Sequence, residues 1–144
     1  MSRAGVFLIV VLALSAGAIV AQIARRRWRS RQVRQVAVQA GLHYSPVDRF
    51  ALAGRIAPKL ECPGAANVHI LDLVYGLRNE QLRYVFTVEF TRGVLRTKRT
   101  PRRAFLAVEP KNRAVRDGNL QLTSVDGALD LIHQYQQLIA MASA

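Results

Sequence analysis

The hydrophobic and polar positions divide the chain into one continuous apolar run and a longer part with shorter, alternating patterns. The run extends from Ala4 to Ala24, contains neither a charged residue nor a proline, and includes eleven Val, Leu, Ile or Phe residues. About 20 helical residues cross a bilayer core of roughly 30 Å. These eleven side chains favour insertion by on the order of 3 to 7 kcal/mol. The pattern therefore predicts an N-terminal transmembrane anchor over residues 1–24.

A strongly basic segment follows the apolar run. Between Arg25 and Arg34 there are six arginines, one tryptophan and no acidic residue. Apolar residues at helical spacing from Val33 to Ala40, with Gly41 as a C-terminal cap, predict a juxtamembrane helix over residues 25–41. The side chains that we expect at the membrane surface, in contact with the bilayer and with anionic lipid, are Arg25, Arg26, Arg27, Trp28, Arg29, Arg31 and Arg34.

The distribution of charge around the run predicts its orientation. Arg3 is the only charged side chain before the run, whereas six arginines follow it. The positive-inside bias then places the N-terminus outside and the C-terminal domain in the cytoplasm, as in a single-pass protein of a cell's inner membrane. Two alternatives place the domain outside: a signal peptide cleaved after Ala18, and a pilin-like leader that ends at Gly5. The pilin-like layout departs from its family at Val10, where most members have Glu.

Residues 42–144 are expected to form one small α+β domain, an antiparallel sheet packed by a C-terminal helix. After the junction, a short helix from Pro46 to Leu52 is predicted, with Ser45 and Asp48 in a capping pattern. Alternating apolar and β-branched residues predict three strands of an antiparallel meander and a short fourth strand, at residues 67–75, 82–91, 103–109 and 119–123.

The C-terminal helix is expected to begin with a cap at Thr123 or Ser124. Its apolar stripe has a 3.6-residue period and is expected to cover the sheet; it consists of Ala128, Leu131, Ile132, Tyr135, Leu138, Ile139 and Ala142. His133 lies off this stripe and is expected to face solvent.

A second basic patch lies at the connection between the predicted second and third strands. The formal net charge is +12, and the whole excess falls in this patch and the first basic segment, because basic and acidic side chains balance elsewhere. The patch is a solvated loop, or it contacts the membrane surface or an acidic protein partner. Nucleic acid is disfavoured, because the loop has no aromatic residue for base stacking. Its members are Arg92, Arg96, Lys98, Arg99, Arg102 and Arg103.

Residues with the spacing of known catalytic, metal or cofactor motifs are absent from the sequence. The single cysteine, Cys62, has no partner for an internal disulfide, and the three histidines are far apart in sequence. Nucleophile-elbow, P-loop, dinucleotide and HExxH patterns do not occur. We therefore expect a non-enzymatic protein without a cofactor; an enzyme with a site beside Cys62 is the least supported class.

One stretch resembles uncharacterised bacterial single-pass membrane-anchored proteins. The resemblance lies in the single span, the arginine-rich helix, the junction from Gly41 to Asp48 and the strand that opens with Asn67-Val68. It implies an architecture and supplies no catalytic residue. Together with the charge pattern it favours a membrane-tethered interaction or scaffold module that contacts anionic lipid. The alternative is a pilin-like or secretion-system subunit with a β-rich head outside the cytoplasm.

Overall fold

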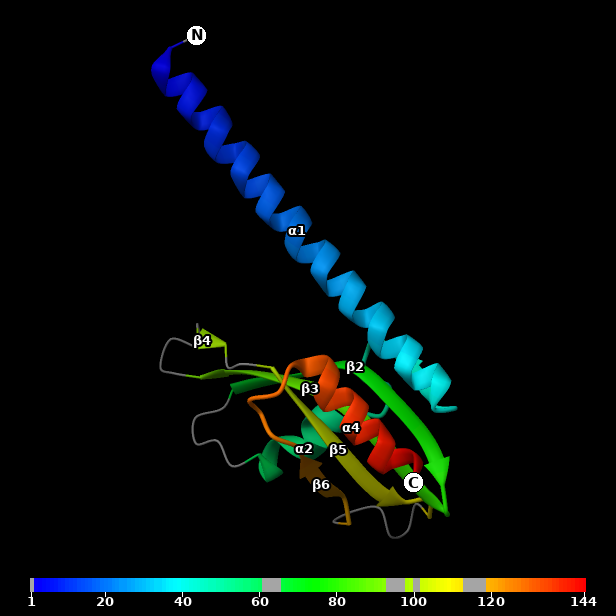
Figure 1. Cartoon of the computed structure of the whole chain (residues 1–144). Coiled ribbons are helices and arrows are strands. Elements are labelled where there is room, and N and C mark those ends of the chain that lie inside the picture. Colours follow the sequence, from blue (N-terminus) through cyan, green and yellow to red (C-terminus); the bar gives the residue numbers. More distant parts are fainter. Residues whose placement is uncertain (1, 61–65, 93–97, 100–101, 113–118) are drawn as a thin grey trace. The chain divides into compact units, whose positions relative to one another are not determined.

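The chain folds into two compact units, residues 1–31 and 32–144. The computed structural model describes residues 2–60, 66–92, 98–99, 102–112 and 119–144. The long helix α1 (Arg3–Gln39) forms the first unit and contributes its last residues to the second. By length and composition, α1 is long and apolar enough to cross a membrane (Figure 1). No other part of the described chain covers the large apolar side chains of α1 up to Ile23. They are therefore free to face lipid, as a membrane-spanning helix requires.

The end of α1 is set by a glycine. Gly41 has a φ of 71°, the left-handed conformation that glycine adopts without steric cost. Its N–H donates to the carbonyl of Val38 at 3.0 Å, and the N–H of Leu42 donates to the carbonyl of Ala37 at 2.9 Å. This pair of bonds is a Schellman motif, so the predicted helix end at Gly41 is confirmed.

The second unit contains an antiparallel sheet with the strand order β1-β2-β3-β5-β6, and β4 pairs with β3 beside this path. The strands are β1 (His43–Ser45), β2 (Ala66–Arg78), β3 (Gln81–Arg92), β4 (Lys98–Arg99), β5 (Arg103–Pro110) and β6 (Gln121–Ser124). With the C-terminal helix α4 (Leu131–Ser143), this is the predicted α+β fold. The meander of three long strands is therefore confirmed.

Both faces of the sheet are covered, as Figure 1 shows. On one face Val74, Val85 and Leu106 pack with α4 and with Val33 and Ala37 at the end of α1. On the other face, Tyr84, Phe86 and Val88 pack with Leu52 and Ile56 of the short helix α2 (Leu52–Ile56). The predicted apolar stripe from Leu131 to Ala142 therefore packs on the sheet, whereas its first predicted member, Ala128, precedes α4 and is exposed.

The predicted helix from Pro46 to Leu52 is wrong, because α2 begins only at Leu52 and leads into the 3₁₀ turn η1 (Ala57–Lys59). Ser45 belongs to β1, a short edge strand that the sequence pattern does not predict. Its hydroxyl donates to the carbonyl of Val47 at 2.9 Å. The carboxylate of Asp48 instead accepts from the N–H of Ala53 at 3.0 Å. The turn is thus held by Asp48, and the helix starts several residues later than the capping pattern predicts.

Two other predicted boundaries are also wrong. The predicted strands at 67–75 and 82–91 leave residues 76–81 as a loop, but the structure has a two-residue turn at Asn79 and Glu80, both with positive φ, and β2 and β3 pair right up to it. Such turns match the twist of a hairpin, but Glu is an unusual residue at a positive φ. At the other end of the domain, Thr123 and Ser124 pair with β5, and the cap of α4 is Asp130, whose carboxylate accepts from the N–H of Leu131.

Candidate functional site

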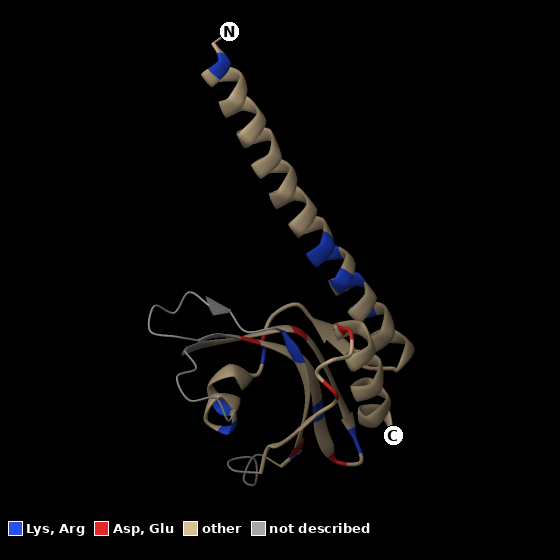
Figure 2. Cartoon of the chain, turned by 60° about the vertical axis from the view of Figure 1, so that its left-hand side comes forward, with Lys and Arg blue, Asp and Glu red and all other residues tan. Residues whose placement is uncertain are grey.

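The basic segment, Arg25 to Arg34, lies entirely on α1, within its C-terminal half. Arg25, Arg26, Arg27, Arg31 and Arg34 are exposed, and Arg29 is half-buried. Trp28 is 63% exposed, which is unusual for a large aromatic residue unless a partner or a membrane covers it. Figure 2 shows basic residues and no acidic residue along α1. The segment therefore presents cations and one indole ring with no acid on the same helix.

The predicted second basic patch divides in the structure. Arg102 donates through Nε to Glu89 at 3.0 Å. Arg103 donates to the hydroxyl of Ser124 and to the carbonyl of Val125, both at 3.1 Å. Each of these two arginines therefore has an acceptor within the domain. Arg96 lies outside the described residues, and only the backbone is described for Arg92, Lys98 and Arg99.

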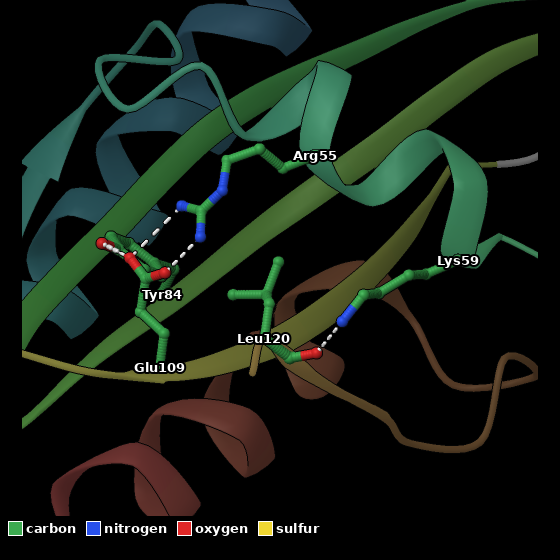
Figure 3. A network of polar contacts seen from close by, with 5 residues as sticks. All are labelled: Arg55, Lys59, Tyr84, Glu109 and Leu120. Carbon is green, nitrogen blue, oxygen red and sulfur yellow. Dashed lines mark hydrogen bonds and ion pairs between the residues drawn. The ribbon is translucent and has the colours of Figure 1, made fainter. Parts of the chain in front are cut away.

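A buried ionic network that the sequence pattern does not predict joins α2 to the sheet. The Glu109 side chain is completely buried on β5, and Arg55 of α2, 30% exposed, forms a bidentate ion pair with it. The hydroxyl of Tyr84 donates to Oε1 of Glu109 at 2.5 Å. Lys59 of η1 donates to the carbonyl of Leu120 (Figure 3). A buried carboxylate without such partners would cost several kcal/mol, so the network binds α2 to this face.

The local sequence carries little signal for this network. Arg55 and Glu109 are 54 residues apart, so no helical or strand periodicity connects them. The one available sign is that Glu109 shares a strand face with Phe105 and Ala107, since side chains alternate along a strand. An acid at a core-facing position needs a cation, and this argument predicts a partner without identifying it.

A second network surrounds Tyr135 on the α4 face. Its hydroxyl lies 2.7 Å from that of Thr87 and donates to the carbonyl of Asp72 at 2.8 Å. The Asp72 carboxylate accepts from the hydroxyl of Tyr44 at 2.7 Å. Burial, the largest cause, raises the pKa of the Tyr135 hydroxyl well above 10, and the nearby Asp72 raises it further. A phenol that stays protonated in this way cannot serve as a base at neutral pH. The hydrogen bonds of Tyr135 instead hold α4 on the sheet.

The other candidate residues for chemistry are not brought together. Cys62 lies outside the described residues, and His43, His69 and His133 are all exposed. Within the described part of the chain, no group of three His, Cys, Asp or Glu residues is close enough to hold a metal ion.

No protein-family model matches the chain, and no curated protein or solved structure was found to match it.

Proposed function

We propose that the chain is a single-pass protein of a bacterial inner membrane and holds its C-terminal domain at the cytoplasmic face. There the domain works as a non-enzymatic interaction or scaffold module, and the basic segment contacts anionic lipid headgroups. The observation that carries this proposal is the asymmetry of charge on α1. One arginine precedes its apolar run, whereas six follow it and no acid lies on the helix.

Anionic lipid is the partner that suits this segment. The cytoplasmic leaflet has a negative surface potential, and a nearby arginine gains about 1 kcal/mol from it. The second patch adds less support, because Arg102 and Arg103 have acceptors inside the domain. The lipid contact is therefore assigned to the basic segment alone.

The buried networks support a binding or scaffold role over catalysis. The ion pair of Arg55 and Glu109 joins α2 to β5, and the hydroxyl of Tyr135 joins α4 to β2 and β3. Both use their polar groups to hold elements of the fold.

Topology is the test of this proposal. Alkaline phosphatase and a fluorescent protein would be fused separately to Ala144 of the full chain and compared in a bacterial host. A fluorescent, phosphatase-negative result is expected, because the arginines oppose export. Phosphatase activity without fluorescence would overturn the proposal and favour the pilin-like alternative. A variant with Arg25, Arg26, Arg27 and Arg29 all changed to Gln should gain phosphatase activity, because only two of the six arginines then follow the run and the charge asymmetry is much smaller.

A further inference from the structure

We propose that one face of α1 is a binding site for a single anionic phospholipid. Its phosphate lies between Arg27 and Arg31, beside the indole of Trp28, and an acyl chain lies along Val20, Ile23 and Ala24. The inference rests on the proposed function and adds to it a lipid class and one face of the helix.

These six side chains line an open groove of about 450 Å³, and all of them belong to the first compact unit. Their spacing of three and four residues places them along one face of the helix. The groove therefore belongs to one face of α1.

The chemistry of the groove changes along its length. Toward the N-terminus it is lined by Val20, Ile23 and Ala24, and toward the C-terminus by Arg27, Trp28 and Arg31. An amphiphile with an apolar chain and an anionic head matches this order. Guanidinium groups bind phosphate oxygens in a bidentate manner, and the indole N–H is a further donor. A zwitterionic head would add a cation beside two arginines, so an anionic lipid suits the site better.

The depth of the groove fits the same occupant. Its apolar end lies inside the run predicted to cross the bilayer, and Arg27 and Arg31 follow the end of that run. Tryptophan is enriched at the level of the headgroups, because its ring is amphipathic. A lipid with its head at Trp28 therefore directs its chain into the hydrocarbon core along the apolar end.

The chain supplies its own reporter and its own control. Trp28 is the only tryptophan, so all tryptophan fluorescence comes from the proposed site. Arg25 and Arg29 have the same spacing as Arg27 and Arg31 but point to the opposite side of the helix, at 100° per residue. This control pair also lies about 3 Å nearer to the apolar run. If only depth or net charge mattered, substituting the control pair would therefore lower the preference for anionic lipid at least as much as substituting Arg27 and Arg31.

The full chain would be reconstituted in mixed phosphatidylcholine and phosphatidylglycerol bilayers, with bromine on the acyl chains of one lipid at a time. Quenching of Trp28 by each brominated lipid gives their relative occupancy. The wild-type chain should prefer phosphatidylglycerol over phosphatidylcholine on the order of tenfold. In the Arg27→Gln/Arg31→Gln variant this preference should fall to about twofold or less. In the Arg25→Gln/Arg29→Gln variant it should stay within about twofold of the wild-type value.

Other results would overturn the inference in recognisable ways. Equal losses in the two double variants would show attraction by net charge without a site, and would leave the proposed function standing. No preference in wild type would remove both the site and the lipid contact of the proposed function. If neither brominated lipid quenches Trp28, a second copy of the helix or another protein covers the groove, and the lipid site is wrong.

Discussion

Arginine is used in opposite ways in the basic segment and in the domain of residues 42–144. In the domain, Arg55 pairs with Glu109, Arg102 pairs with Glu89, and Arg83 donates to the carbonyl of Ala142 at 2.8 Å. In the basic segment, five of the six arginines are exposed, and no acidic residue occurs before Asp48. These three arginines of the domain have acceptors on other elements, whereas the sequence of α1 supplies no carboxylate for those of the basic segment.

This difference shows that a cluster of basic residues in a sequence does not by itself define a binding surface. The two clusters are alike in number and density, with six cations each and no acid. In the second, the fold brings Glu89 to Arg102 and Ser124 to Arg103 from other strands. An arginine that is already hydrogen-bonded within the domain must break that bond before it binds a new partner. The net free energy of the new contact is therefore smaller.

The largest effect is expected from breaking the domain's ion pair. Arg55→Met should lower the free energy of unfolding by about 3 kcal/mol, because it leaves the carboxylate of Glu109 buried without its cation. Urea titration of the detergent-solubilised chain, followed by circular dichroism of the sheet, measures this change.

The matched control for that variant removes the charge of both partners. Arg55→Met/Glu109→Gln should recover part of the loss, because no uncompensated charge then remains buried. A double variant less stable than Arg55→Met would contradict the assignment of the cost to the buried carboxylate of Glu109.

High pH distinguishes the basic segment from the domain. Arginine keeps its charge at high pH, whereas the domain loses stability there, because burial opposes ionisation of the Tyr135 hydroxyl. The pKa of Tyr135 in the folded chain lies well above 10, the ordinary value. Unfolding therefore releases a proton above pH 10. The stability from this group is complete below pH 10 and falls by up to about 1.4 kcal/mol per pH unit as pH rises from 10 toward the folded pKa.

Unfolding titrations between pH 8 and pH 11 measure that loss. Tyr135→Phe should be less stable at pH 8, because it loses the bonds to Thr87 and to the carbonyl of Asp72. It should also show a shallower decline above pH 10. Parallel curves for the two proteins would mean that other groups cause the alkaline loss.

The sequence predicts those parts of the fold that follow from local periodicity. The apolar run of α1 and the alternation from Leu82 to Thr91 each extend over enough residues to identify an element. Gly41 marks a helix end because a left-handed residue there favours glycine. The predicted membrane-surface residues all lie on α1, because the helical pattern of their own segment is enough to place them on one helix.

The missed features depend on residues far apart in the chain. Strand β1 has three residues and forms only because Tyr44 meets Val74 of β2. The start of α4 depends on β6, because the pairing of Ser124 with Phe105 keeps that residue out of a helix. The partner of Glu109 lies on α2, whose position the short-helix pattern misplaced. Such choices are settled by tertiary contacts, which local propensity does not contain.

Arg83 gives an intermediate case, because its acceptors are backbone carbonyls at a helix end. Its Nη1 donates to the carbonyls of Ala142 and Ala144, both at 2.8 Å, and of Met141 at 3.4 Å, at the C-terminal end of α4. Arg83→Met should cost about 1 kcal/mol, because the carbonyls lose a cationic donor that also favours the helix dipole. Hydrogen exchange should accelerate in the last turn of α4, whereas unchanged exchange there would contradict the capping role.

The smallest effect on stability is expected in the basic segment. Arg27→Gln/Arg31→Gln should change the free energy of unfolding of the domain by no more than about 0.5 kcal/mol, because both side chains are exposed and lie outside the domain core. The same urea titration as for Arg55→Met provides the measurement. A loss as large as that of Arg55→Met would mean that these arginines have structural acceptors, and the contrast between the basic segment and the domain would fail. Unchanged stability with a lost preference for anionic lipid would separate binding from folding in a single variant.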